Sequence, residues 1–228
     1  HIIQKFLETG DRQAVKSAAI AGCSSIADQK IVRGLKSETL WDLDVIPSPY
    51  TSGIFKDFMD RFKMLPQIET SRGCPYLCTF CTIGLNEGRM RKHSFEYTRE
   101  EILYLKEHYP YRALRIADPN WGMAAKDVRL AEYLYDLHEK EGYPSSLRVY
   151  YSAGGPFKNI QRMAFLMRKL LPLNMSFQSL NEETLTAIKR GNMPLNKVEE
   201  MVAFAREHKI ATSTELISGL PKETYQIF

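Results

Sequence analysis

The spacing of apolar residues along the chain separates residues 66–228 from the residues that precede them. After residue 66, short apolar runs alternate with longer stretches in which apolar residues recur every three or four positions. In 125–141, for example, the apolar positions from Val128 to Leu137 follow helical spacing, which marks one buried helix face. Turns rich in Gly, Pro, Asn and Ser separate these segments.

This pattern predicts strands and helices in alternation. Strands are expected at 67–71, 113–117, 147–152, 174–178 and 212–218. Helices are expected at 99–108, 125–141, 159–169, 182–189 and 197–208. Units of about 32 residues indicate βαβ repeats and a parallel sheet. Such units form part of a barrel or an open doubly wound sheet, and in both cases the loops at the carboxyl ends of the strands carry the chemistry.

The residues before 66 have a different character. Segments 14–21 and 30–33 are expected to form two strands of a hairpin around a turn rich in Ser and Asp. Pro47 and Pro49 exclude a helix at that point and favour an extended linker. The sequence has neither an initiator Met nor a charged and then apolar leader, and we expect it to be a piece of a longer protein.

Composition narrows the class of protein. The 228 residues include 31 Lys and Arg and 27 Asp and Glu, for a net charge of +4, which does not by itself indicate nucleic acid as a partner. With 44% hydrophobic and 25% charged residues, the chain is neither disordered nor collagen-like. No apolar run reaches the roughly 18 residues of a membrane span, so none is expected. Four cysteines are too few for a disulfide scaffold and favour a reducing, cytoplasmic location.

Three of the cysteines, Cys74, Cys78 and Cys81, fall within eight residues directly after the first predicted strand. Three thiolates in a C-x3-C-x2-C spacing can converge on a soft metal centre, either zinc or an iron–sulfur cluster. A closed zinc site would need His93 or the distant Cys23 as its fourth ligand. A triad without a fourth ligand is better explained by a [4Fe–4S] cluster with one open iron, and three structural thiols near a turn are the simpler alternative.

The run Cys74-x3-Cys78-x-Phe80-Cys81 resembles the signature of radical S-adenosylmethionine (SAM) enzymes, including the aromatic residue before the last cysteine. The resemblance implies an α/β fold, a partial (β/α) TIM-type barrel of the radical SAM kind with an N-terminal hairpin and linker remnant. It also implies that the three cysteines hold a [4Fe–4S] cluster whose open iron chelates SAM. One electron, from a donor such as flavodoxin or ferredoxin, would then cleave SAM to a 5′-deoxyadenosyl radical that takes hydrogen from a small-molecule substrate.

The same resemblance assigns roles to residues at later strand ends. After the second strand, Asp118 stands where the family receives the SAM ammonium group, with Asn120 close by, although a turn or helix-cap role also suits Asp118. After the fourth strand, the polar residues expected near the SAM ribose are Ser176, Gln178 and Ser179. Arg190 would bind the SAM carboxylate, or else is a solvated charge at a helix end.

The fifth predicted strand is similar to the family pattern G-x-I-x-G-x-x-x-E. Ile217, Gly219 and Glu223 match that pattern, and Glu215 replaces its first glycine. In the third strand, Tyr150 or Tyr151 is a candidate for the wall of the substrate cavity.

The linker around Pro47 looks like the join between a cobalamin-binding domain and a radical SAM barrel. On that resemblance, 1–50 is the tail of a truncated, possibly cobalamin-binding domain with its linker. Residues 51–228 are then the first five units of the radical SAM core. Members of this subfamily are typically methyltransferases, so a cobalamin-dependent methyl transfer is expected.

Two other functions remain open. A radical SAM tRNA methylthiotransferase would carry a second three-cysteine cluster upstream, where this sequence has only Cys23. A zinc-stabilised nucleic-acid-binding module would use the basic run 89–93, a run that is more often a solvated loop.

Overall fold

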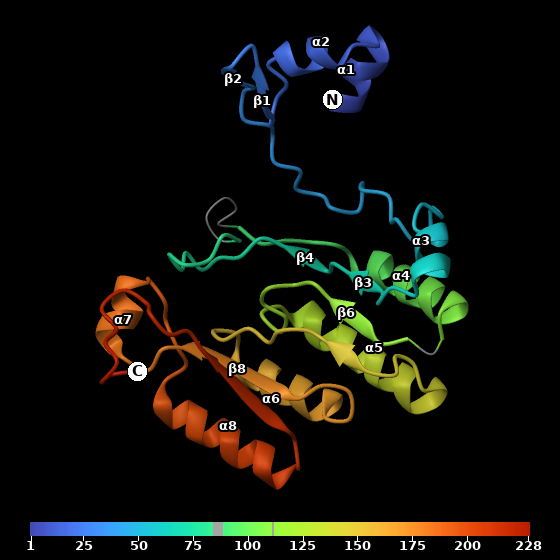
Figure 1. The fold of residues 1–228 in the computed structure, drawn as a ribbon. Coiled ribbons are helices and arrows are strands. Elements are labelled where there is room, and N and C mark those ends of the chain that lie inside the picture. Colours follow the sequence, from blue (N-terminus) through green and yellow to red (C-terminus); the bar gives the residue numbers. More distant parts are fainter. Residues whose placement is uncertain (84–88, 111) are drawn as a thin grey trace. The chain divides into compact units, whose positions relative to one another are not determined.

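The computed structural model describes residues 1–83, 89–110 and 112–228, and it divides them into two units, 1–41 and 42–228 (Figure 1). No helix in the described part of the chain is both long and apolar enough to cross a membrane.

The first unit contains two short helices and a hairpin. Its elements are α1 (Ile2–Thr9), α2 (Arg12–Ser17), β1 (Ser24–Ala27) and β2 (Lys30–Arg33). The hairpin pairs β1 and β2 antiparallel, which confirms the strand predicted at 30–33. The strand predicted at 14–21 is wrong, because Asp11 caps a helix there by accepting hydrogen bonds from the backbone N–H of Gln13 and Ala14 at 2.8 and 3.2 Å.

The second unit alternates strands and helices much as the apolar pattern predicts. Its helices are α3 (Lys56–Phe62), α4 (Phe95–His108), α5 (Ala125–Glu141), α6 (Phe157–Met167), α7 (Glu182–Ala187) and α8 (Leu195–Glu207). Its strands are β3 (Gln67–Ile68), β4 (Ser71–Arg72), β5 (Arg91–Lys92), β6 (Leu114–Ile116), β7 (Leu147–Arg148), β8 (Leu173–Gln178) and β9 (Thr212–Leu216). The strand predicted at 67–71 is divided, because β3 ends at Ile68 and β4 turns away to pair antiparallel with β5.

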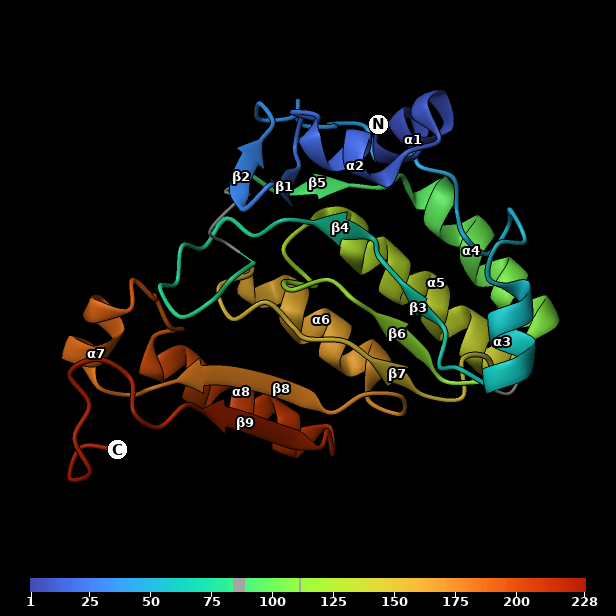
Figure 2. The same cartoon turned by 45° about the horizontal axis from the view of Figure 1, so that its top comes forward.

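The strands that follow one another in the βαβ pattern pair in parallel. Strand β6 lies between β3 and β7, and β8 pairs with β9 (Figure 2). An isolated parallel bridge joins Trp121 to Tyr151 beyond the ends of β6 and β7. Over the described residues no ladder joins β7 to β8, so the unit is a mixed α/β fold with two parallel sheets.

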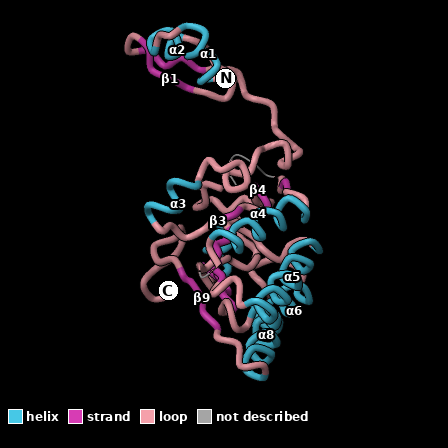
Figure 3. The backbone as a smooth tube through the Cα atoms, turned by 90° about the vertical axis from the view of Figure 1, so that its right-hand side faces the viewer, coloured by secondary structure: helices cyan, strands magenta, loops and turns pink. Residues whose placement is uncertain are grey.

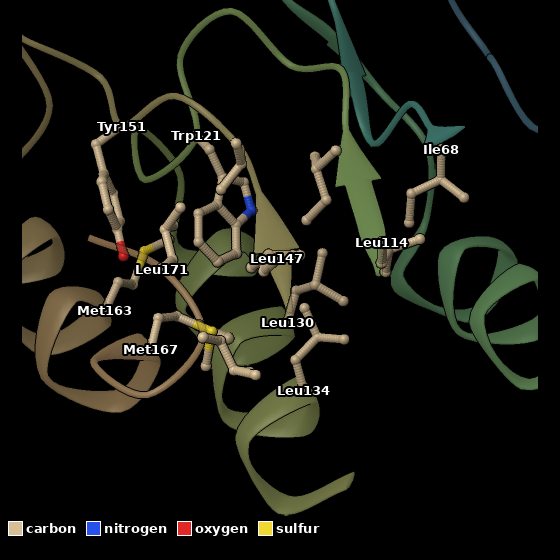
Figure 4. Close-up of a cluster of buried hydrophobic side chains, with 14 of the residues drawn as sticks. Ile68, Leu114, Trp121, Leu130, Leu134, Leu147, Tyr151, Met163, Met167 and Leu171 are labelled. Atoms are coloured by element: carbon tan, nitrogen blue, oxygen red, sulfur yellow. The ribbon is translucent and has the colours of Figure 1, made fainter. Parts of the chain in front are cut away.

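Helices α5, α6 and α8 lie together in one layer beside the strands (Figure 3). Apolar side chains from β6, α5 and α6 fill the space between the helices and the sheet, among them Leu114, Leu134 and Met163, each buried completely (Figure 4). Each such side chain contributes roughly 1.5–3 kcal/mol relative to an exposed position. The strand residues between the buried ones, such as Arg115, point to the other face of the sheet and are exposed.

The segment with the two prolines, 42–50, has no helix or strand, as predicted, and is fixed to the second unit by polar contacts. The buried Ser48 hydroxyl donates to Glu101 Oε1 of α4 at 2.6 Å, and Tyr50 Oη donates to the carbonyl of Gln67 at 2.6 Å. Asp44 accepts from the backbone N–H of Ser94, the residue that caps α4. The linker therefore packs as part of this unit.

The buried Glu101 makes stability depend on pH. Glu101 is 4% exposed, and burial raises its pKa to about 7, an effect that the Ser48 hydrogen bond opposes and nearby Glu69 reinforces. Because the pKa is higher in the folded than in the unfolded chain, the folded state loses stability as pH rises from about 4.5 to 7. The unfolding free energy of Glu101→Gln, taken relative to that of the wild type, should rise by up to about 3 kcal/mol as pH goes from 4.5 to 8.

Urea unfolding at the two pH values measures this gain. The control is Glu96→Gln on the same helix, whose carboxylate is exposed and faces Arg129 at 3.6 Å. If E101Q differs from the wild type in free energy of unfolding by the same amount at both pH values, the raised pKa of Glu101 is not the cause of the pH dependence.

Candidate functional site

The cysteine loop leaves the sheet at β4, and Gly73, with φ +93°, makes the turn that begins it. Cys74 and Cys78 are buried and Cys81 is partly exposed, and all three are free thiols. Two backbone hydrogen bonds fix the loop, from Cys81 N–H to the Cys78 carbonyl and from Thr79 N–H to the Ile188 carbonyl just after α7. The loop is therefore held against the part of the chain that follows β8.

All three thiols line one cavity of about 240 Å³. The rest of its wall comes from the segments that follow β6 and β7, from β8 and β9, and from the segment after α7. Its lining residues include Tyr76, Phe80, Asn120, Tyr150, Tyr151, Gly154, Ser176, Gln178, Arg190, Gly191 and Glu215. A site built from the carboxyl ends of parallel strands is the expected place for chemistry in this architecture.

Polar side chains contact two of the sulfurs. Asn120 Nδ2 donates to Cys74 Sγ at 2.9 Å. The guanidinium of Arg190 lies 3.8 Å from Cys78 Sγ and also donates to the carbonyl of Ser176. Hydrogen bonds to cysteine sulfur are typical of the surroundings of iron–sulfur and zinc thiolates, where they adjust the properties of the metal.

The donor set suits a metal cluster better than a single ion. Within 1–83, 89–110 and 112–228, no three His, Cys, Asp or Glu side chains are grouped closely enough to hold one metal ion. His93 does not line the cavity, since its Nδ1 lies 3.0 Å from Asp44 Oδ1 and its ring stacks on Tyr97. A Cys3His zinc site with His93 thus has no structural support. Three free thiols spread around one cavity fit a four-iron cluster, in which each thiolate binds a separate iron.

The structure places Asp118 outside the cavity. Its carboxylate is 1% exposed and accepts from the backbone N–H of Thr70 and Ser71 at 2.8 and 3.0 Å and from both of their hydroxyls. Burial raises the pKa of Asp118, although these hydrogen bonds act in the opposite direction. The side chain of this loop that faces the thiols is Asn120.

Of the three candidate residues at the end of the fourth predicted strand, two line the cavity and one does not. Ser176 and Gln178 line the cavity, and Ser176 Oγ donates to Glu215 Oε2 at 2.9 Å. The ladder between β8 and β9 is irregular at this point, and Gln178 has φ +67°, so its side chain leaves the strand alternation. Ser179 is buried beside the cavity, where its hydroxyl donates to Glu223 Oε1 at 3.2 Å.

The remaining candidates support the strand ends. Ile217 N–H donates to the Gln178 carbonyl at 2.8 Å, and Glu223 Oε2 accepts from the backbone N–H of Gly219 at 2.9 Å. None of Ile217, Gly219 and Glu223 is among the residues that line the cavity. They lie next to its wall and hold the loop after β9.

Gly154 and Tyr76 are among the lining residues that sequence reasoning did not predict. A Cβ placed on Gly154 would lie 2.2 Å from Tyr76 Oη, so only glycine permits the observed approach of these segments. The signal was the Gly154-Gly155 pair directly after the third predicted strand. Tyr150 and Tyr151 both line the cavity.

The basic run 89–93 is exposed only in part. Arg89 and Lys92 are exposed, whereas Arg91 and His93 are 7% and 5% exposed, and Arg91 belongs to strand β5 of the hairpin with β4. A nucleic-acid-binding surface needs a cluster of exposed cations, and this run supplies two.

The chain is similar to curated enzymes over most of its length. It is 32% identical over 225 residues to the cobalamin-dependent radical SAM methyltransferase TokK of Streptomyces tokunonensis, which covers 92% of this chain and 32% of that protein. It is 28% identical over 165 residues to a tRNA-2-methylthio-N(6)-dimethylallyladenosine synthase of a Sulfurihydrogenibium species, which covers 68% of this chain and 36% of that protein. The chain thus spans about a third of the length of these relatives.

A solved structure has the same fold. The radical S-adenosylmethionine methyltransferase TsrM from Kitasatospora setae, with tryptophan substrate and a SAM analogue bound, superposes with a TM-score of 0.69 at 19% identity. The superposition covers 99% of this chain and 45% of that one. Residues 68–228, well over half of the chain and including all three clustered cysteines, match the profile of the Radical SAM superfamily, and the chain belongs to that superfamily.

Proposed function

We propose that this chain is the cofactor-binding part of a cobalamin-dependent radical SAM methyltransferase. The observation that carries the proposal is the gathering of three free thiols at one cavity at the carboxyl ends of parallel strands. The likeness to TokK, which covers nearly the whole chain, supports methyl transfer as the reaction class. The likeness to the tRNA methylthiotransferase covers less of the chain at lower identity, and that function is the second candidate.

Cys74, Cys78 and Cys81 would hold a [4Fe–4S] cluster in this site. When bound, a cluster with one open iron binds SAM and supplies the electron that cleaves it to a radical. Asn120 holds the sulfur of Cys74 by its hydrogen bond and fixes the orientation of that ligand. Phe80, Tyr76 and Tyr150 give the cavity a largely apolar wall that excludes water from a reactive intermediate.

Other residues of the cavity wall are proposed to orient SAM. Arg190, which lines the cavity beside Cys78 Sγ, can bind a carboxylate, while Ser176 and Gln178 offer polar groups to ribose hydroxyls. Asp118, Ser179, Ile217, Gly219 and Glu223 keep the family roles only as predictions, since each lies outside the cavity wall. Their hydrogen bonds give all five a supporting role for the loops that carry the wall.

The whole protein's fold, domains, cellular location and electron donor are part of the same proposal. We propose that the two parallel sheets are successive parts of a partial (β/α) barrel, and that 51–228 is the radical SAM core. Residues 1–50 would be the end of an upstream cobalamin-binding domain with its linker, and we assign no residue of this chain to cobalamin. A cytoplasmic location and an electron donor such as flavodoxin or ferredoxin complete the proposal.

Iron content tests the ligand assignment. Anoxic reconstitution of the chain should give about four iron and four sulfide per chain, and Ala at Cys74, Cys78 or Cys81 should abolish most of it. Cys23→Ala, in the first unit, is the control and should keep its iron. Zinc uptake without iron, or a full cluster in the Cys74→Ala variant, would overturn the assignment.

Substitution of two glycines in the cavity wall, Gly154 and Gly191, tests whether the cavity binds SAM. Ala at Gly154 must push Tyr76 aside, because the new Cβ would lie 2.2 Å from its hydroxyl. We expect G154A to weaken SAM affinity by about fivefold, or roughly 1 kcal/mol, with little change in melting temperature. Equilibrium dialysis of the reconstituted chain measures the affinity.

Gly191→Ala is the matched control. Gly191 lines the same cavity, but a Cβ there meets no atom within 4 Å, so SAM affinity should not change. Equal effects of G154A and G191A would show that the Tyr76 contact does not shape the SAM site.

A further inference from the structure

Two arginines lie side by side on the sheet face opposite the helices. Arg115 of β6 and Arg148 of β7 are direct partners in the parallel register. Their strand neighbours Leu114, Ile116 and Leu147 are buried toward the helices, whereas both arginines are exposed. Adjacent strands lie about 4.8 Å apart, so the two guanidinium groups share one region of this face.

Neither guanidinium has a partner within the described residues, since no hydrogen bond, ion pair or ring contact involves either one. Other arginines of this unit are paired, as Arg162 is with Glu132. Like charges directly opposite each other on neighbouring strands destabilise a sheet. Two unpaired cations in register therefore cost stability, and an anion bound between them would recover it.

The arginines line an open cavity of about 490 Å³. Its remaining wall includes polar side chains such as Asn174 and Ser213, and its single carboxylate, Glu215, accepts a hydrogen bond from Ser176. Guanidinium groups bind carboxylate and phosphate oxygens in a bidentate manner. The wall thus has the chemistry of an oxyanion site.

This cavity adjoins the one that holds the thiols. Tyr150 and Glu215 line both, so a ligand anchored at the arginines can extend past these two residues toward the cysteine loop. We propose that Arg115 and Arg148 bind an oxyanion, a carboxylate or phosphate, of a small-molecule substrate whose reacting part lies in the thiol cavity. The inference rests on the proposed function for its link to catalysis, and on the register and cavity for the anion site itself.

Calorimetric titration of the reconstituted full chain with pyrophosphate and with succinate, at low ionic strength, tests the site. One of the two probes should bind at one site per chain, and R115Q/R148Q should weaken that binding at least tenfold. Tighter binding of pyrophosphate identifies a phosphate group, and tighter binding of succinate identifies a carboxylate. Arg162→Gln, which removes one positive charge from the helix surface, should bind the same probe as the wild type does.

Absence of binding for both probes would overturn the proposal, as would equal binding by wild type and R115Q/R148Q. Iron content and SAM affinity are measured on the same samples, and R115Q/R148Q should keep both. If the wild type takes up no iron but its anion binding depends on the arginines, the proposed function fails and the anion site stands. If iron and SAM bind but neither probe does, the anion site alone fails.

Discussion

The carboxylate of Asp118 determines where the cysteine loop begins. It follows β6, yet both its oxygens are bound by the backbone and hydroxyls of Thr70 and Ser71, which precede the loop. A carboxyl group that is buried this deeply is tolerated only when its hydrogen bonds are complete. Lys126 adds a further link, because its Nζ donates to the carbonyl of Thr70 at 2.6 Å. The segment before the loop is thus held against the ends of two other elements.

This anchor explains how distant residues meet at the thiols. Cys74 comes three residues after Ser71, and Asn120 comes two residues after Asp118. Once Asp118 has bound Thr70 and Ser71, the Asn120 amide is brought to the sulfur of Cys74. Asp118 can therefore matter for the cluster site without touching it, which is a different role from the ammonium contact that the family pattern implies.

The sequence predicted most of the second unit because the apolar alternation and the turn residues act locally. It placed the thiols correctly at the first strand end, since C-x3-C-x2-C is itself a local pattern. It could not predict which way Asp118 points, because its partners are 47 and 48 residues away. The helix at Arg12–Ser17 was not predicted, because the apolar residues in 14–21 also suit a strand and the Asp11 cap that starts the helix lies outside that run. The contact of Gly154 with Tyr76 is equally non-local.

The two faces of the strands have separate roles, because successive side chains of a strand point to opposite faces of the sheet. One face supplies leucines and isoleucines to the helices and stabilises the fold. The other face is free of that requirement, and here it carries arginines that a packed core would exclude. The strand ends and the loops after them hold the groups that suit a metal cofactor, and β6 and β7 hold the cations. A single register thus places both sets of groups along one continuous wall, at a spacing that the strands fix.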